Sequence, residues 1–515
     1  MKTIIETLLG YLSWKSIVTF ITIYVVDLAL YRLTFHRLAR FPGPRLAAAT
    51  RYYEGYYDVW KGGQYTFKIG QLHKEYGPII RISPHELHVS DPEFFEQLYS
   101  HYGRWDKYGW ATDAMGVRGS ALHESDHFIH KARRQALNPF FSKARVTAHL
   151  DKMRYQIDKL CIELAELVIT GETFNLGAAV HAVAHDIATD FIIGKTYNRL
   201  DRKAFDSHNV STVESIGARW RLTKFVRWFN PLLMALPIGW VMKIADEDLK
   251  AFLRHVKRAL SDTQDLVEAV EAKADGPRTL IHDILNSKLP ASEKTFERVF
   301  VEMAIVSGAG FETMASVLRI ILFHVFNNLE ILSRLRGELS SANEGYTDEL
   351  ELKVLEQLPY LNAVINEGLR LSPAVASRMA RIAPDRDIFY KDWRIPAGTP
   401  VGMTAILMHT DEESFSNPKE FNPDRWMDPL EQKKGFKAFV PFSKGTRICL
   451  GMHLAWAELY LVISTLVQRF DFHFPEAKAE DFEAVADHFA IGTRGKVGWM
   501  HQEMSVSIGY DAMMC

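Results

Sequence analysis

Residues 442–451 constrain the fold of this chain more than any other stretch, because they place one cysteine in a turn just before a helical pattern. The stretch reads F-S-K-G-T-R-I-C-L-G. Gly445 and Gly451 let the backbone turn sharply without a Cβ in the way, and Arg447 brings a fixed positive charge close to Cys449. A helix N-terminus and nearby cations favour the thiolate form of cysteine. One thiolate without a C-x-x-C partner cannot complete a zinc or iron–sulfur site, but it can be the axial ligand of a haem.

The same residues fit the pattern F-x-x-G-x-R-x-C-x-G through Phe442, Gly445, Arg447, Cys449 and Gly451. This pattern resembles the cysteine-ligand loop of the cytochrome P450 family, the haem-thiolate monooxygenases. The resemblance implies a mainly α fold with a smaller β region (α+β), and haem b ligated through iron by Cys449. The alternative is a buried structural cysteine in a glycine-containing turn, without haem.

The composition agrees with a large globular protein in a reducing compartment. The chain has 515 residues, 47% of them hydrophobic and 24% charged, with a formal net charge of −2 and only three cysteines. So few cysteines exclude a disulfide scaffold, and the charge gives no general attraction to nucleic acid.

The N-terminal residues predict a membrane anchor. Residues 8–31 are mostly apolar, and a basic cluster (Arg32, His36, Arg37, Arg40) follows them, which predicts a cytoplasmic C-terminal side. We therefore divide the chain into an anchor (1–31), a basic, proline-rich hinge (32–48) and a catalytic domain (49–515). The hinge is similar to that of membrane-bound family members, which implies a single-pass anchor in the endoplasmic reticulum with the catalytic domain in the cytosol. A helix lying in the membrane interface is the alternative.

A long helical pattern over residues 297–326 contains the sequence A-G-F-E-T at 309–313. A glycine inside a helix costs about 1 kcal/mol relative to alanine, so Gly310 predicts a local bulge with room for a small ligand. The sequence is similar to the family motif A-G-x-[ED]-T. The resemblance places Ala309 and Gly310 beside the haem, assigns Thr313 to hydrogen-bonding dioxygen and assigns Glu312 to proton delivery. The alternative is a helix with a solvated Glu–Thr pair.

Two further motifs predict a structural set of charges. Glu367 and Arg370 share one helix face at i,i+3 spacing and match the family motif E-x-x-R. Their partner resembles Arg425 in F-N-P-D-R-W. A buried Arg–Glu–Arg set must be fully paired, and this one would hold the Cys449 loop in place.

The residues that would bind the haem propionates depend on the resemblance. His130 stands where the family often has Trp, and Arg134 follows four residues later where the family has Arg. Arg381, rather than Arg378, would contact a second propionate. Arg133 and Lys131 are expected to be surface charges. The pairs His127/His130 and His181/His185 have the spacing of zinc ligands but lack a third ligand, so surface or core histidines are the expected outcome.

The implied reaction is insertion of one oxygen atom from O2 into a hydrophobic small molecule. Electrons would come from a separate NADPH-dependent flavoprotein reductase, since no flavin- or NADPH-binding glycine-rich unit is visible in the sequence. Its docking face would be basic: Lys131, Arg133, Lys143, Lys433, Lys434 and Lys437. Similarity to fungal trichodiene-oxygenase-like members implies a terpenoid or polyketide-derived substrate. Two alternatives remain: a haem-thiolate isomerase or dehydratase that does not use O2, and a haem-based binding or sensor protein.

Overall fold

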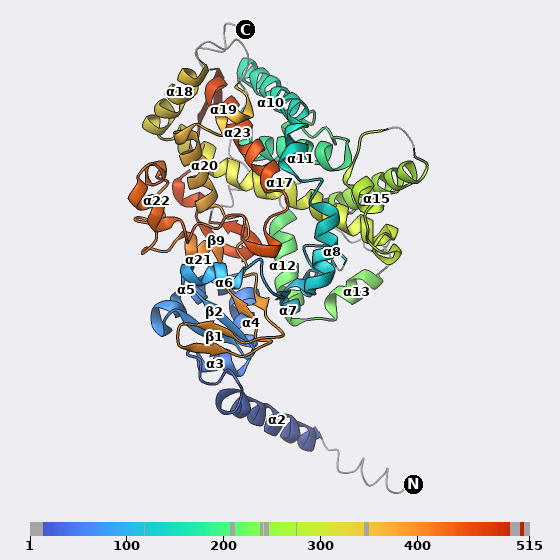
Figure 1. The fold of residues 1–515 in the computed structure, drawn as a ribbon, viewed down its shortest axis with the longest axis vertical. Coiled ribbons are helices and arrows are strands. Elements are labelled where there is room, and N and C mark those ends of the chain that lie inside the picture. Colours follow the sequence, from blue (N-terminus) through green and yellow to red (C-terminus); the bar gives the residue numbers. More distant parts are fainter. Residues whose placement is uncertain are drawn as a thin grey trace.

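The long helix α17 (Phe296–Phe326) crosses the middle of the molecule, and the other large helices pack around it (Figure 1). The computed structural model describes residues 14–117, 119–171, 173–205, 212–236, 240, 247–273, 276–343, 350–494 and 505–508. The sequon at Asn209 and part of the aromatic-rich segment 205–250 lie outside these ranges. The fold is mainly helical with a smaller β region, as expected.

The helices differ widely in length. Those of seven residues or more, besides α17, are α2 (Trp14–Thr34), α5 (Tyr65–Tyr76), α8 (His127–Leu137), α10 (Leu150–Thr170), α11 (Leu176–Ile193), α12 (Thr212–Phe225), α13 (Phe229–Ala235), α15 (Glu247–Glu271), α18 (Leu329–Asn343), α20 (Pro359–Leu371), α22 (Pro429–Gly435) and α23 (Met452–Arg469). The shorter ones are α3 (Arg45–Ala49), α4 (Tyr52–Gly55), the π-helical turn η1 (Tyr56–Trp60), α6 (Phe95–Leu98), α7 (Gly109–Thr112), η3 (Asp113–Met115), α9 (Lys143–Thr147), α16 (Leu280–Leu285), α19 (Leu352–Leu355) and α21 (Ala405–His409).

The largest sheet has five strands in the order β1-β2-β7-β4-β3 and lies beside α5 at the lower end of the molecule (Figure 1). Its strands are β1 (Ile79–Ser83), β2 (Glu86–Val89), β3 (Asp106–Lys107), β4 (Arg381–Ile382) and β7 (Val401–Gly402). Three two-stranded sheets pair β5 (Ile388–Tyr390) with β6 (Trp393–Ile395), β9 (Ala484–His488) with β10 (Ala490–Thr493), and β8 (Phe470–His473) with β11 (Ser505–Ile508).

Small residues let α11 pack closely against α17. Nearly every side chain of α11 is buried, and the position of a Cβ on Gly310 lies 3.1 Å from the Cβ of Ala188. A larger residue at 310 would push the helices apart. The bulge expected at Gly310 is absent, since α17 runs as one unbroken α-helix. This glycine therefore serves helix packing.

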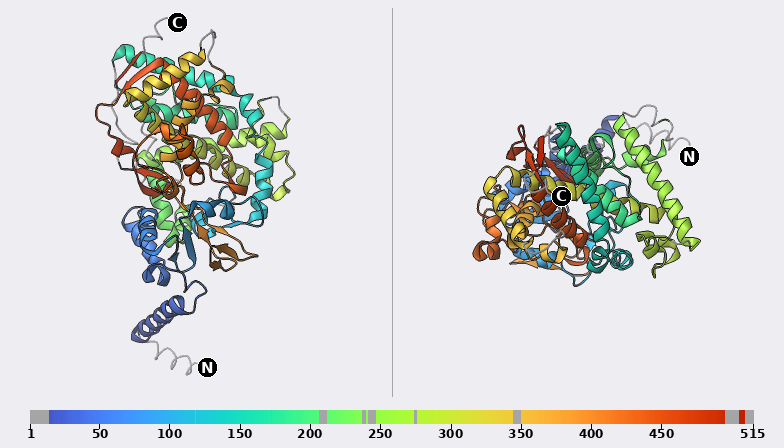
Figure 2. Two further views of the ribbon diagram at one scale, coloured as in Figure 1. Left: turned by 60° about the vertical axis from the view of Figure 1, so that its left-hand side comes forward. Right: turned by 90° about the horizontal axis from the view of Figure 1, so that it is seen from above.

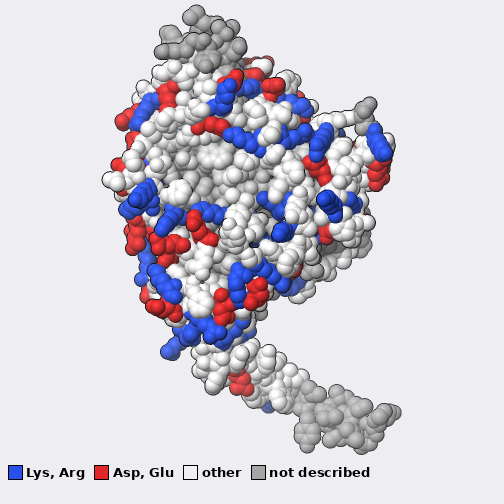
Figure 3. Space-filling model, in the orientation of Figure 1, with Lys and Arg blue, Asp and Glu red and all other residues white. Residues whose placement is uncertain are grey.

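The N-terminal helix α2 projects away from the rest of the molecule (Figures 1 and 2). None of its residues is buried. Two other helices in the described part of the chain, α11 and α17, are also apolar and long enough to cross a membrane, but 89% of the apolar window of α11 and 50% of that of α17 is buried. Figure 3 shows few charged side chains on α2 and a gathering of Lys and Arg where it meets the body.

The hinge after α2 is fastened to the body of the protein. Leu38 and Phe41 are buried, the Arg37 guanidinium donates to Ala397 O at 2.7 Å, and Arg81 N donates to Pro42 O at 2.6 Å. Gly43 has φ +145°, and a Cβ there would lie 2.5 Å from Arg81 O. The direction of α2 is thus set by contacts with the body as well as by the prolines.

Candidate functional site

The turn before α23 positions Cys449. Cys449 N donates to Phe442 O at 2.9 Å, and Ile448 N donates to Gly445 O at 3.1 Å. Gly445 has φ +75°, and a Cβ there would lie 2.1 Å from Tyr99 O, so no other residue fits. Gly451 has an ordinary negative φ of −87°, and no protein atom lies within 4 Å of where its Cβ would stand. Gly451 is therefore not required by the backbone of the turn. Because it has no side chain, it leaves open space beside Cys449.

Open space, which we call the hollow, lies beside Cys449: the cysteine is exposed, and the Cβ position of Gly451 has no neighbour within 4 Å. Burial nevertheless raises the pKa of the Cys449 thiol despite the Gly451 amide and the Arg134 charge, which lower it. The effects expected from the helix N-terminus and a nearby cation are therefore present, and burial opposes them. A bound metal ion deprotonates such a thiol outright.

Glu367, on α20, is the centre of a buried group of hydrogen-bonded side chains. It accepts two hydrogen bonds from Arg370, both at 2.8 Å, and one each from Arg425 Nε, Trp426 Nε1 and Asn422 N at 2.9–3.0 Å. The side chains of Glu367 and Arg370 have no exposed surface. The predicted three-residue set is assembled, and we call it, with His409, the Glu367 cluster.

His409 joins the Glu367 cluster to the segment before the cysteine turn. Val440 N donates to His409 Nε2 at 2.9 Å, and His409 Nδ1 lies 2.9 Å from Arg370 O. The first contact makes Nε2 the acceptor, so Nδ1 carries the proton. Burial lowers the pKa of this ring to about 3. Glu367 therefore reaches the turn through Arg370 and one neutral imidazole.

Three cations lie close enough together that the charges of Arg447 and Arg381 add to burial in lowering the pKa of Lys107, and each of them bonds backbone oxygens instead of carboxylates. Arg447 NH1 donates to Glu124 O at 2.7 Å, Arg381 NH1 donates to Met379 O at 2.7 Å, and Lys107 Nζ donates to Leu122 O at 2.5 Å. Burial lowers the pKa of all three, to about 9 for Arg447.

His130 and Arg134 on α8 lie near these cations, because the charges of Arg447, Lys107 and Arg134 add to burial in lowering the pKa of His130. Burial and the charge of Arg447 lower the pKa of His130 to about 2, so the ring is a neutral donor. Among the described residues, His130 Nδ1, Arg134 Nε and Arg447 Nε are buried without a hydrogen-bond partner. Buried donors of this kind are costly unless satisfied, and a ligand with carboxylates would satisfy them. The site thus fits haem, with a thiol on one side and donors for its propionates at the edge.

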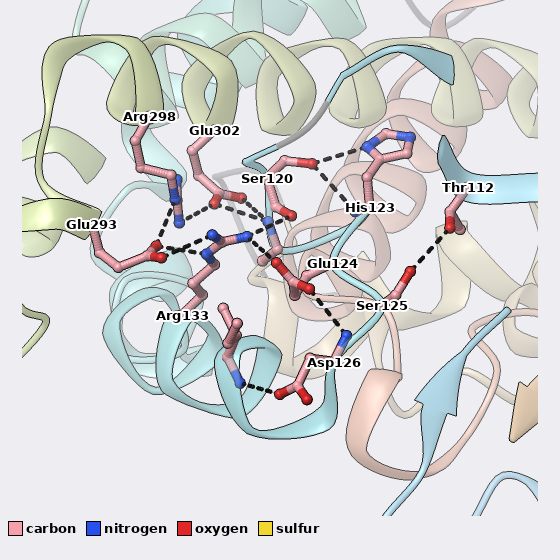
Figure 4. A network of polar contacts seen from close by, with 12 residues as sticks. Thr112, Ser120, His123, Glu124, Ser125, Asp126, Arg133, Glu293, Arg298 and Glu302 are labelled. Atoms are coloured by element: carbon pink, nitrogen blue, oxygen red, sulfur yellow. Dashed lines mark hydrogen bonds and ion pairs between the residues drawn. The ribbon is translucent and has the colours of Figure 1, made fainter. Parts of the chain in front are cut away.

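Arg133 does not lie at the surface as expected. Its guanidinium bonds Glu293 at 2.7 and 2.9 Å and Glu124 at 2.8 Å, and Arg298 connects Glu293 with Glu302 of α17. Figure 4 shows this network joining α8 to α17 around the strap of residues 120–126. Ala121 N donates to Glu302, and the strap carbonyls accept from Arg447. The sequence did not predict this network, because its members come from two segments about 160 residues apart.

On α17 the predicted residues point in different directions. Ala309 is exposed to the hollow, and the Thr313 hydroxyl donates to Ala309 O at 2.9 Å. Glu312 turns toward α11, where its Oε1 lies 3.3 Å from His181 Nε2. Glu312 Oε2 has no hydrogen-bond partner in the described part of the chain. A carboxylate and a hydroxyl thus occupy adjacent positions, but the structure shows no direct bond between them.

A pocket next to the hollow has an apolar wall and a charged wall. The apolar side is formed by Met115, Leu122, Trp220, Met379 and Phe489, and the charged side includes Glu54, Glu86, Lys224 and Arg378. Phe489 is held at φ +76° by the hydrogen bond from its N–H to Asp487 Oδ1 at 2.9 Å. The turn at Phe489 therefore places its ring in the wall of this pocket.

The charged wall is an ion cluster that the sequence did not reveal, and we call its members Glu54, Asp58, Glu86, Lys224 and Arg378 the Lys224 cluster. Lys224 pairs with Glu54 at 3.1 Å and also with Asp58, and Arg378 pairs with Glu54 at 2.9 Å and Glu86 at 2.8 Å. This accounts for Arg378, which faces carboxylates, whereas the Arg381 guanidinium lies over the ring of Tyr99 at 4.7 Å. No group of three or more metal-ligating side chains occurs among the described residues.

Comparison with known proteins identifies the arrangement. A family model described as Cytochrome P450 matches residues 57–493. A cytochrome P450 monooxygenase of Ascocoryne sarcoides is 37% identical and aligns over 87% of this chain and 90% of its own. A tryptophan 6-hydroxylase of Fusarium equiseti is also 37% identical, over 90% and 91%, and conidiogenone synthase of Penicillium rubens is 36% identical, over 87% and 90%.

A solved structure has a fold similar to that of this chain. The haem domain of cytochrome P450DA superposes with a TM-score of 0.67, covering 88% of this chain and 95% of that domain, at 15% sequence identity. At that identity the likeness concerns the fold alone.

Proposed function

Since this chain belongs to the cytochrome P450 family, it is a haem-thiolate monooxygenase, and we propose the roles of its individual residues from the contacts described above. When bound, haem supplies the activation of O2 with two electrons, so that one oxygen atom enters the substrate and the other leaves as water. The observation that carries the assignment is the cysteine turn, where one thiol faces a hollow edged by unsatisfied donors.

We assign the remaining roles as follows. Cys449 ligates the iron, in a turn shaped by Phe442, Gly445 and Gly451. His130, Arg134, Arg381 and Arg447 hold the propionates, and Lys107 joins them. Thr313 and Glu312 hold and pass the protons that the reaction consumes, beside Ala309 and Gly310. Glu367, Arg370 and Arg425 keep the cysteine turn in place and have no chemical role.

The substrate that we propose is a hydrophobic terpenoid or polyketide-derived intermediate of fungal secondary metabolism. The apolar wall of Trp220, Met379 and Phe489 supports it, as does the relative named conidiogenone synthase. Another relative is named as a tryptophan hydroxylase, so indole amino acids belong in the same test panel.

We propose that α2 anchors the enzyme in the membrane of the endoplasmic reticulum and that residues 32–48 are the hinge to a cytosolic catalytic domain. Support comes from the full exposure of α2 and from the exposed aromatic side chains of Tyr52, Trp60 and Trp228 on the body. Such side chains favour the membrane interface. Fractionation of the expressed enzyme, with and without residues 1–31, tests the anchor.

The proposed electron donor is an NADPH-dependent flavoprotein reductase. Lys131, Lys433 and Lys434 are exposed and suited to an acidic partner. Lys143 and Lys437 form ion pairs with Glu356 and Glu93. Arg133 is buried, so we do not include it in the docking face. Charge reversal at Lys131 should slow reductase-supported turnover in a salt-dependent way and leave the CO spectrum unchanged.

The deciding experiment for the reaction is co-expression with a reductase and feeding of the substrate panel under 18O-labelled O2. The expected result is an NADPH-dependent product that has gained one labelled oxygen atom. Product formed without NADPH or without labelled oxygen would show an isomerase or dehydratase instead.

A further inference from the structure

A buried polar contact on the side of Glu312 that faces α11 is not used by the roles assigned so far. His181 on α11 places its Nε2 3.3 Å from Glu312 Oε1, with the His181 side chain 2% exposed and that of Glu312 20% exposed. His181 is one of the histidines that the sequence marked as a possible zinc ligand or core residue. Its partner in the fold is the acid of the A-G-x-[ED]-T motif.

The neighbouring arginine fixes which nitrogen of His181 carries the proton. Arg199 NH1 lies 3.5 Å from His181 Nδ1. A guanidinium has donors only, so Nδ1 is the acceptor in this contact, and Nε2 carries the hydrogen. His181 therefore donates to Glu312 Oε1.

Apolar surroundings strengthen this contact. The ring of Phe311 packs edge-on against His181 at 5.2 Å and also lies below the Arg199 guanidinium at 6.0 Å. A hydrogen bond shielded from water is electrostatically stronger than one at the surface. Arg319, on the same helix as Glu312, adds positive charge: burial lowers its pKa to about 10, and Glu312 opposes that shift.

The two oxygens of Glu312 consequently differ. Oε1 accepts from His181, whereas Oε2 is buried and has no hydrogen-bond partner among the residues described. A carboxylate fixed through one oxygen keeps one rotamer and leaves the other oxygen to take up a proton.

We propose that His181, with its tautomer set by Arg199, is the positioning residue that holds Glu312 for proton delivery. This inference rests on the proposed role of Glu312. A residue that merely joins α11 to α17 would not change how the electrons from NADPH are divided between product and peroxide. A positioning role for His181 would change this division.

The first test compares product formed per NADPH consumed in five variants. His181→Phe removes the donor, and we expect a loss of about tenfold, below the 10²–10⁴ that a complete acid–base group contributes. His181→Gln places an amide donor near the position of Nε2 and should restore coupling to within about twofold of the wild type. Adding His181→Phe to Glu312→Gln should cost nothing beyond Glu312→Gln alone, because both act through one carboxylate. His324→Phe is the matched control on α17, where the ring stacks on Phe421 at 4.7 Å.

Equal coupling in His181→Phe and the wild type would overturn the proposal, as would full additivity in the double variant. If the wild type itself gives no oxygenated product, the proposed function fails and takes this role with it.

A second readout does not depend on turnover. NMR spectra of the holoenzyme, labelled with 15N-histidine and held in the ferrous–CO form, report which ring nitrogen of each histidine carries the proton. The His181 signal is assigned as the one that is missing in His181→Phe, and it should show the proton on Nε2. A proton on Nδ1 alone would overturn the assignment even if coupling fell, because Arg199 would then not set the tautomer.

Discussion

The Glu367 cluster and the Lys224 cluster are both buried sets of charges beside the site, but they differ in how they are built. Glu367 and Arg370 lie three residues apart on one helix, and every oxygen of Glu367 is bonded. The Lys224 cluster joins α4, η1, β2, α12 and the segment at Arg378, and one oxygen of Glu54 has no partner among the described residues. A cluster built around one fully bonded carboxylate suits a fixed ligand turn, whereas a more dispersed cluster suits a wall that packs against varied substrates.

The largest effect should come from removing the centre of the local cluster. Glu367→Gln leaves Arg370 and Arg425 buried without a counter-charge, which typically costs about 3–5 kcal/mol of unfolding free energy. We expect loss of haem and a lower midpoint in urea denaturation. Glu93→Gln breaks an exposed pair with Lys437 and is the control, with a change below about 1 kcal/mol. Equal small losses in both variants would contradict the role of the Glu367 cluster.

Breaking the dispersed cluster should cost less. After Lys224→Met, Glu54 still pairs with Arg378. Asp58 can take up a proton, because burial already raises its pKa to about 6 and the Lys224 charge that lowers it is gone. We expect a loss of roughly 1–3 kcal/mol and retained haem, measured by urea denaturation and the CO spectrum. Lys195→Met, at a half-exposed lysine paired with Asp262, is the control. A loss as large as that of Glu367→Gln would erase the difference between the clusters.

The two regions should respond to pH in opposite directions. Because the pKa of His409 falls from 6.5 to about 3 on folding, its contribution to stability is complete above pH 6.5 and is lost as the pH falls toward 3. Asp58 has a raised pKa, so its contribution is present below its unfolded value of 3.8 and is lost as the pH rises toward 6.

The free-energy difference between wild type and His409→Gln, followed from pH 7 to pH 4, should therefore shrink. For Asp58→Asn it should change with the opposite slope over the same range. Parallel slopes would refute the assigned protonation states.

The smallest effect should come from His130, where a motif position carries an unusual residue. His130→Trp keeps an N–H donor, so haem dissociation should change by less than about fivefold, or roughly 1 kcal/mol. His130→Phe removes the donor and should speed dissociation by about tenfold or more, since hydrogen bonds to charged groups contribute about 1.5–3 kcal/mol. Transfer of haem to apomyoglobin measures both rates, and equal rates for the two variants would remove His130 from the propionate site.

The sequence predicted what depends on local spacing. The cysteine turn and the Glu367–Arg370 pair follow from motifs, and the structure has them. The buried position of Arg133, the propionate-side Lys107, the Lys224 cluster and the partner of Glu312 could not be predicted. Each joins residues more than a hundred positions apart or, like Lys107, lies in an irregular stretch, so no periodicity marks it. Gly310 is the opposite case. Its motif could be recognised in the sequence, but its role in packing against Ala188 could be seen only in the folded structure.

The central claim is that Cys449 binds haem iron as a thiolate, and the spectrum of the reduced, CO-bound protein tests it most directly. The account predicts a thiolate-type Soret band in the wild type, its loss in Cys449→Ala, and its retention in Cys161→Ala, which changes the buried cysteine of α10. A colourless wild-type protein, or a Cys449→Ala spectrum identical to that of the wild type, would contradict it.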